Sequence, residues 1–331
     1  MDYDMLVNRE EITDSSVSVF TDSTHIPEKY IRTGEALDGE IVGEDESYEL
    51  PVVDMAKLLD PALSASETAK LGSACRNWGF FQLTGNGVDE AVMQRMKDNT
   101  VQFFSLPLES KKTVSVRGSG FEGFGHHFSR STRKLDWAES LILATQPVGD
   151  RNMEMWPTEP PTFRYALESY SAETTDLAMR LLRFMAADLG IERETLQGAF
   201  AGKRQSMAIH HYPPCRHREK VVGIIPHTDG TGLTLLLHVD DTPGLQIRKD
   251  GRWFPVRPLP GAFVINVGDT LEVMTNGTCR AQASIGGLVA PLPELLKGAE
   301  ARYKAIEQPE YIKGNFKALA DGTQFIKSLR I

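Results

Sequence analysis

The sequence predicts an α+β protein in which helices flank an antiparallel β core. Three observations support this fold class. Helical periodicity dominates the first two hundred residues, whereas residues 206–274 hold short apolar runs separated by turn residues. Runs spaced this closely favour an antiparallel sandwich or barrel over a βαβ wound sheet, because parallel strands need a long crossover between them. Helical periodicity returns after residue 291, so we expect helices, then the β core, then helices again.

The N-terminal half divides into helices and short strands. Acidic residues open the helix expected at 89–106, and Pro107 ends it. A long helix is expected from Phe163 to Leu189, closed by Gly190, which supplies the left-handed conformation common after a helix C-terminus. The other elements are a strand entering a helix at 48–59, a helix followed by a strand at 66–85, and a loop rich in glycine and aromatic residues at 118–129.

The predicted β core consists of short strands joined by turns. The sequence "KDG" between "LQIR" and "RWFPV" marks a hairpin, with glycine at the position that needs a positive φ. The strands are expected at 206–215, 221–229, 232–239, 244–249, 252–256 and 261–274. The whole chain then divides into an acidic N-terminal extension at 1–48, a mixed α/β region with the long helix at 49–200, the β core at 201–290 and a helical segment at 291–331.

Composition limits the class of protein. The first 48 residues carry 13 acidic and 3 basic side chains, a balance of −10 within a total of −9, so the rest of the chain is nearly neutral. This nearly neutral remainder has no basic stripe of the kind that binds nucleic acid. Three widely spaced cysteines without a C-x-x-C pair suggest a reducing compartment, and we expect a cytoplasmic protein. No signal-peptide pattern or membrane-spanning apolar run is present, so no membrane partner is expected.

The triplet "HTD" at 227–229 carries the clearest chemical signal. If it ends a strand, His227 and Asp229 point to the same face, because side chains two apart share a face of a sheet. One imidazole and one carboxylate suit Fe(II), whose usual site has two histidines, one carboxylate and open positions. Zinc also accepts these ligands, and a hydrogen-bonded His–Asp pair without metal is the commoner meaning of such a triplet.

A long set of collinear motifs gives this triplet a context. It comprises "LPVVDM", "ACRNWGFFQLTGNGV", "FFSLPLESKK", "HHYPPC", "PHTDGTGLTLLL", "GLQIRKDGRWFPVRPLPGAFVINVGDTLEVMTNG" and "PLPELL". With these motifs the chain resembles the plant 2-oxoglutarate/Fe(II)-dependent dioxygenases over nearly its whole length, and most closely the senescence-related and codeine-demethylase-like branch. The resemblance implies a double-stranded β-helix, or jelly roll, flanked by helices.

The resemblance also implies cofactors and site residues. His227 and Asp229 match two of the three iron ligands, 2-oxoglutarate would be the co-substrate, and ascorbate would serve as reductant. Tyr212 matches a tyrosine that contacts the co-substrate, and His210 replaces the asparagine of the same motif. On this basis we expect hydroxylation or O-demethylation of a small plant secondary metabolite or hormone by a monomeric protein.

The chain departs from this family after Arg280. Aligned without a gap, Ser284 stands where the third iron ligand, a histidine, belongs, and Ile285 stands where an arginine follows it. The R-x-S motif that holds the far carboxylate of 2-oxoglutarate has no counterpart beyond this point. The simplest interpretation is an internal deletion of roughly 20–30 residues, which leaves a β core lacking some strands. His238 is the other histidine considered as a ligand, but a core or rim position is expected for it.

These losses predict a poor dioxygenase. Two protein ligands plus exchangeable water would hold Fe(II) weakly, and the co-substrate would lose its ion pair. Two alternatives to an enzyme therefore stay open. The chain could be a catalytically inactive truncated isoform that acts as a binding protein, or it could be a mispredicted gene product.

Overall fold

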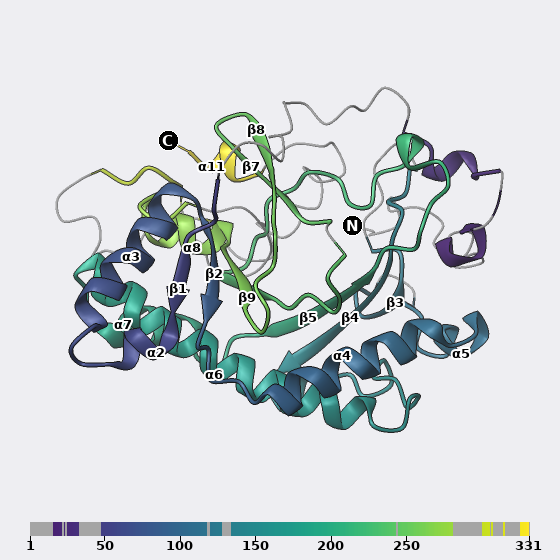
Figure 1. Ribbon diagram of the computed structural model, residues 1–331, viewed down its shortest axis with the longest axis horizontal. Coiled ribbons are helices and arrows are strands. Elements are labelled where there is room, and N and C mark those ends of the chain that lie inside the picture. The colour runs from purple at the N-terminus through teal and green to yellow at the C-terminus, as the bar shows by residue number, and fades with distance from the viewer. Residues whose placement is uncertain are drawn as a thin grey trace.

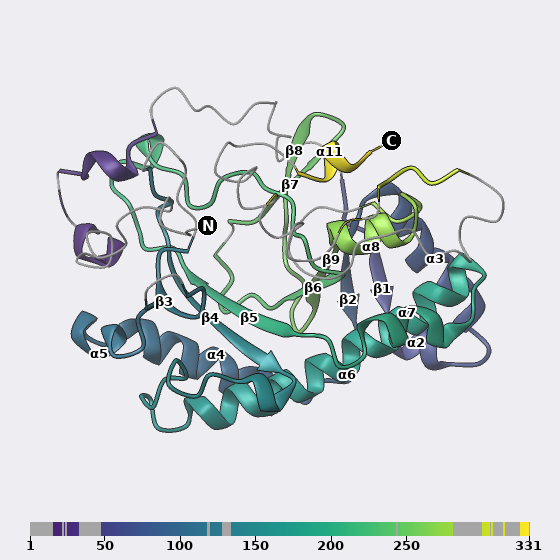
Figure 2. The ribbon, with the colours of Figure 1, turned by 180° about the vertical axis from the view of Figure 1, so that it is seen from behind.

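Two long helices support the strands from one side. In the computed structural model, α6 (Phe163–Leu189) and α4 (Glu90–Ser105) run side by side beneath the sheets (Figures 1 and 2). The structure describes residues 16–32 apart from 22 and 24, residues 48–280 apart from 118–119, 128–133 and 243, and residues 300–330 apart from 305, 307–313 and 315–324.

The helix boundaries follow local sequence signals. Helix α6 ends at Gly190, whose φ of 71° is left-handed, which confirms the predicted helix and its stop. Asp89 caps α4 by accepting a hydrogen bond of 2.8 Å from the backbone N–H of Ala91. The other helical elements are η2 (Val17–Phe20), η3 (Glu28–Tyr30), α2 (Met55–Leu59), α3 (Ser64–Asn77), α5 (Leu108–Lys112), η4 (Val148–Asp150), α7 (Arg193–Phe200), η5 (Arg218–Lys220), α8 (Asp269–Met274) and α11 (Ile326–Leu329).

A four-stranded sheet joins the start of the chain to the β core. Its order is β1-β2-β9-β6, and it is antiparallel except for the parallel pair β1 and β2. Its strands are β1 (Val52–Asp54), β2 (Phe80–Thr84), β9 (Phe263–Val267) and β6 (Leu233–Leu236). All five side chains of β9 are buried, as expected of a strand with neighbours on both edges and packed faces.

A three-stranded antiparallel sheet and a hairpin complete the strands of the described part. The sheet has the order β3-β4-β5, with strands β3 (Gly123–Gly125), β4 (Glu139–Gln146) and β5 (Gln205–His211). The hairpin pairs β7 (Gln246–Lys249) with β8 (Arg252–Pro255). Its turn places Asp250 and Gly251 at φ of 51° and 84°, so the hairpin predicted from "KDG" is confirmed.

Two strands lie at sheet edges close to the β core. Among the described residues, β5 pairs only with β4, and β6 pairs only with β9. Removing strands from a jelly roll is expected to leave such edges, because the neighbours lose their hydrogen-bonding partners. Ser284, Ile285 and the rest of 281–299, where the deletion was inferred, lie outside the described residues.

Two expected strands differ from the structure. Residues 221–229 form no strand, because their backbone groups make isolated hydrogen bonds to different elements. For example, the N–H of Trp137 donates to the carbonyl of Val222 at 2.8 Å. The strand expected at 261–274 ends at Val267 and continues as α8. Asp269 lies in the first turn of α8, where a carboxylate is favourable beside the helix N-terminus.

One continuous apolar core connects the helices with both sheets. It contains side chains from α3, α4 and α6 together with those of β2, β4 and β9. The largest fully buried side chains include those of Trp156, Phe81, Phe103, Phe163 and Phe263. This core fixes β4, β5 and β9, and these strands position the residues of the candidate site.

Candidate metal centre

The segment that carries His227 and Asp229 is held by the start of α8. The backbone N–H of Asp269 donates to the carbonyl of Asp229 at 2.8 Å, and the hydroxyl of Thr270 donates to the carbonyl of Gly230 at 2.6 Å. The segment is therefore irregular but anchored. The expected strand is absent here, so tertiary hydrogen bonds, and not the alternation of side chains along a strand, orient His227 and Asp229.

The two predicted metal ligands face each other. Nε2 of His227 lies 3.3 Å from Oδ1 of Asp229, and Nδ1 of His227 is 2.8 Å from the carbonyl oxygen of Ile225. Because a carbonyl can only accept, Nδ1 carries the hydrogen and Nε2 is directed to the carboxylate. The other carboxylate oxygen, Oδ2, accepts hydrogen bonds from Thr234 Oγ1 at 2.8 Å and Asn266 Nδ2 at 3.1 Å. Outer contacts of this kind are typical of metal ligands, since they fix ring and carboxylate orientation.

The charge of Asp229 controls the protonation of His227. Burial alone would lower the pKa of His227, but the hydrogen bond and charge of Asp229 outweigh it and raise the pKa overall. A cation of the Fe(II) class would compete with a proton for this pair, because the imidazole must be neutral to act as a ligand.

His210 and Tyr212 lie beside this pair. His210 is on β5 opposite Ser140 of β4, and Ser140 Oγ is 2.7 Å from His210 Nδ1. Burial and the neighbouring His227 lower the pKa of His210 to about 4, so its imidazole is neutral at physiological pH. Tyr212 follows the strand with 46% of its surface exposed. Both side chains interact electrostatically with Asp229, so the structure brings the four predicted site residues into one neighbourhood.

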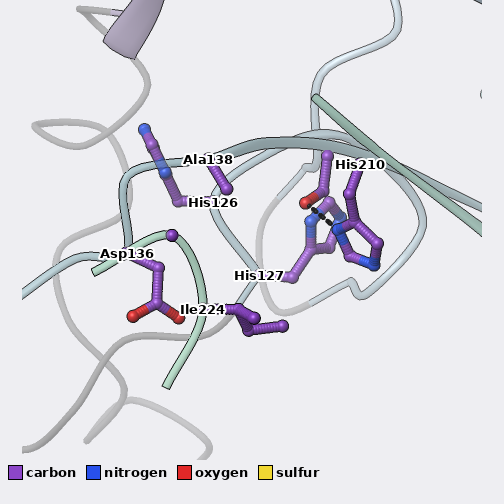
Figure 3. A pocket seen from close by; sticks show the side chains of 8 residues that line it. His126, His127, Asp136, Ala138, His210 and Ile224 are labelled. Atoms are coloured by element: carbon purple, nitrogen blue, oxygen red, sulfur yellow. Dashed lines mark hydrogen bonds between the residues drawn. The ribbon is translucent and has the colours of Figure 1, made fainter. Parts of the chain in front are cut away.

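A small pocket opens next to His210 (Figure 3). One of its walls carries Asp136, whose Oδ1 lies 2.9 Å from Nη2 of the buried Arg32. The complete lining is His126, His127, Asp136, Ala138, Ser140, His210, Gly223 and Ile224. His126 and His127 of the lining come from the glycine- and aromatic-rich loop expected at 118–129. Asp136 and Ser140 were missed, because no local motif marks them.

Trp253 and His238 lie apart from the site. Trp253 is buried in the β7–β8 hairpin beneath Arg248 and does not line this pocket. His238 has Lys97 and Asp240 as its electrostatic neighbours, in agreement with a rim position. Across the described residues, no group of three His, Cys, Asp or Glu side chains is already gathered to hold a metal ion.

Comparisons with known proteins identify related sequences over most of the chain. Residues 50–159 match the family model for the non-haem dioxygenase in morphine synthesis N-terminal domain, and residues 203–285 match the 2OG-Fe(II) oxygenase superfamily. The chain is 38% identical to 2-oxoglutarate-dependent dioxygenase 11 of Oryza sativa subsp. japonica, covering 93% of this chain and 92% of that protein. It is 34% identical to codeine O-demethylase of Papaver somniferum, covering 92% of each chain.

The structure is similar to a solved oxygenase as well. The crystal structure of JOX2 in complex with 2OG, Fe and JA superposes with a TM-score of 0.78 at 26% identity, covering 98% of both chains. The rice dioxygenase for auxin oxidation shares the fold, with a TM-score of 0.69 at 23% identity, covering 86% of this chain and 100% of the other. The fold is thus the double-stranded β-helix with flanking helices, as predicted.

No helix in the described part of the chain is both long and apolar enough to cross a membrane.

Proposed function

Because the chain belongs to the 2OG-Fe(II) oxygenase superfamily, we propose that His227 and Asp229 bind Fe(II) for the oxidation of a small plant metabolite. The observation that carries the proposal is the facing pair itself, with Nε2 of His227 3.3 Å from Oδ1 of Asp229. An imidazole nitrogen and a carboxylate oxygen are ligands that Fe(II) accepts in such enzymes. Iron bound here would couple the oxidative decarboxylation of 2-oxoglutarate to oxidation of the organic substrate, with ascorbate keeping the iron reduced.

The residues beside the pair suit the co-substrate only in part. Tyr212 and His210 offer a phenol and a neutral imidazole next to the ligands, and both can donate a hydrogen bond to a carboxylate. The R-x-S motif that would provide a cation for the far carboxylate has no counterpart after Arg280. By analogy with broken buried ion pairs, this loss costs about 3–5 kcal/mol, or about two to four powers of ten in affinity for 2-oxoglutarate.

The substrate class follows from relatives and from the pocket. Similar proteins include oxoglutarate-dependent flavonoid 7-O-demethylase 1 of Ocimum basilicum and thebaine 6-O-demethylase of Papaver somniferum. In this chain the small pocket beside His210 presents imidazole, hydroxyl and carboxylate groups, which can form hydrogen bonds with polar substituents of such a compound. We therefore propose hydroxylation or O-demethylation of a plant secondary metabolite or hormone. The expectations of a monomer and of a cytoplasmic location rest on the sequence alone.

Coupled turnover tests the proposal directly. The purified protein is incubated with Fe(II), ascorbate and 2-oxoglutarate, and succinate is measured. We expect slow succinate release that is lost in Asp229→Ala and retained in the matched control Asp240→Ala, whose carboxylate lies away from the site near His238. Release that is the same in Asp229→Ala and in the parent protein would reject metal chemistry at this pair.

A second candidate function is binding without turnover. It is favoured by the lack of a gathered three-ligand group in the described residues and by the missing R-x-S motif. If the chain is an inactive truncated isoform, succinate release will be absent while calorimetry still detects a metal ion or 2-oxoglutarate. If it is a mispredicted gene product, the genomic and transcript sequences across codons 280–290 will encode a segment that this chain lacks.

A further inference from the structure

Residues 300–304 and 325–330, called here the C-terminal brace, pack against helix α8. Val273 of α8 shares a buried apolar cluster with Tyr303 and with side chains of α11. Helix α11, drawn in yellow, lies beside α8 in both views (Figures 1 and 2). The two stretches of the brace are joined by an antiparallel bridge between Tyr303 and Arg330, so they dock as one unit.

A buried carboxylate of α8 ties the helix to this brace. The hydroxyl of Tyr303 donates to Oε1 of Glu272 at 2.5 Å, and Nη2 of Arg330 lies 3.3 Å from the same oxygen. Burial and the hydrogen bond to Glu272 raise the pKa of Tyr303 to about 12, so the phenol keeps its proton and donates at physiological pH. The N–H of Arg302 also donates to Oδ1 of Asn276, just beyond α8, at 2.7 Å. Hydrogen bonds to a carboxylate are stronger than neutral ones, so the brace is held by more than apolar packing.

The first turn of the same helix holds the segment with the candidate metal pair. The N–H of Asp269 donates to the carbonyl of Asp229 at 2.8 Å, and the N–H of Gly268 donates to the carbonyl of Gly232 at 2.9 Å. Within this turn the N–H of Glu272 donates to the carbonyl of Gly268 at 3.0 Å. A continuous path of hydrogen bonds therefore runs from the brace through α8 to the backbone of Asp229, and such packed, rigid paths can carry coupling between separate parts of a protein.

We propose that Tyr303 is a positioning residue of the metal centre: docking of the C-terminal brace on Glu272 fixes α8, and α8 fixes Asp229 for binding a cation. This inference rests on the proposed function and adds a residue on which the same site depends. Groups that orient a metal ligand influence metal affinity without touching the metal. Coupling of this kind is reciprocal, so a cation bound at the pair must in turn stabilise the docked brace.

Co(II) titration tests the effect of the brace on the site without reference to turnover. Co(II) is titrated by calorimetry into the full chain under anaerobic conditions, at a temperature where circular dichroism shows each protein fully folded. We expect Tyr303→Phe, which removes only the hydroxyl, to weaken Co(II) binding about fivefold or more, as is usual for coupled sites. The matched control Tyr165→Phe removes a hydroxyl from a tyrosine of α6 that is 59% exposed, and it should leave the affinity unchanged.

Hydrogen exchange provides a second measurement that needs no variant of the brace. The amide of Lys304 reports docking, because it donates to the carbonyl of Leu329 at 2.8 Å. Co(II) should slow exchange of this amide more than exchange of amides in the β7–β8 hairpin, which serve as the reference for a general gain in stability. In Asp229→Ala, Co(II) should leave the exchange of both groups unchanged.

The outcomes separate this inference from the proposed function. Parent-like Co(II) affinity in Tyr303→Phe, or equal slowing of Lys304 and the hairpin, would overturn the positioning role and leave the brace a purely structural element. If Asp229→Ala abolishes Co(II) binding in that case, the proposed metal pair stands. If Asp229→Ala binds Co(II) like the parent protein, or the parent does not bind it, the proposed function fails and the positioning role fails with it. Should Tyr303→Phe not fold, exchange in the parent protein decides.

Discussion

Lys111 and Glu139 form a buried ion pair, and Glu139 lies next to Ser140 on β4. Nζ of Lys111 lies 3.1 Å from Oε2 of Glu139, and the two side chains are 3% and 1% exposed. Lys111 also donates to the carbonyl of Phe104 at 3.1 Å. The perturbation is Lys111→Met, which keeps most of the side-chain length but removes the positive charge.

The expected cost follows from the charge that stays behind. Removing one partner of a buried ion pair typically costs about 3–5 kcal/mol, because the other charge is left uncompensated. Glu139 would keep the backbone N–H of Ser18 at 3.1 Å and His211 at 3.6 Å, which reduces the penalty. We therefore expect the free energy of unfolding to fall by about 3 kcal/mol, the lower end of that range.

Urea denaturation followed by circular dichroism at pH 7 measures this loss. The matched control is Arg117→Met, which breaks an ion pair of the same 3.1 Å length whose side chains are 62% and 75% exposed. An exposed pair contributes about 1 kcal/mol or less. The double variant Lys111→Met/Glu139→Gln should recover part of the loss, because no charge remains buried. Equal destabilisation by Lys111→Met and Arg117→Met would refute the reasoning.

Three further predictions follow from other contacts. Burial raises the pKa of Glu139, but the nearby His211 imidazole and Lys111 ammonium outweigh it and lower the pKa to about 2. This carboxylate should therefore lose its stabilising contribution as pH falls from about 4.5 toward 2. Thermal unfolding from pH 6 to pH 3 should show that loss, and Glu139→Gln should flatten it. Gly79→Ala should cost about 1–3 kcal/mol in urea denaturation, because φ is +67° and a Cβ would lie 2.5 Å from the carbonyl oxygen of Arg280. Thr234→Val removes the 2.8 Å bond to Asp229 and should weaken Co(II) binding about 10–100-fold in calorimetry; unchanged affinity would mean that this hydroxyl does not orient the carboxylate.

Elements with strong local signals could be predicted from the sequence. The helix from Phe163 to Leu189 ends at Gly190, a residue type that commonly terminates helices. The hairpin is specified by the turn residues Asp250 and Gly251. Both signals act between close neighbours in sequence. Their outcome therefore depends little on the rest of the fold.

Elements that depend on distant partners were predicted less well. Residues 221–229 are apolar enough for a strand, but a strand needs a neighbour to pair with, and in the described structure their hydrogen bonds go to separate elements. Val267 ends β9 because α8 begins two residues later and packs back on the 229–232 segment. Hydrophobic pattern alone does not report where such partners lie.

The sequence by itself determined the chemical identity of the candidate site: an imidazole and a carboxylate two residues apart, within motifs that span nearly the whole chain. Only the tertiary structure decided how those groups are oriented and what stands beside them. Asn266 reaches Asp229 across 37 positions, and Ser140 reaches His210 across 70. Contacts over such separations form only when the apolar core packs β4, β5 and β9 together, so no local pattern could have revealed them.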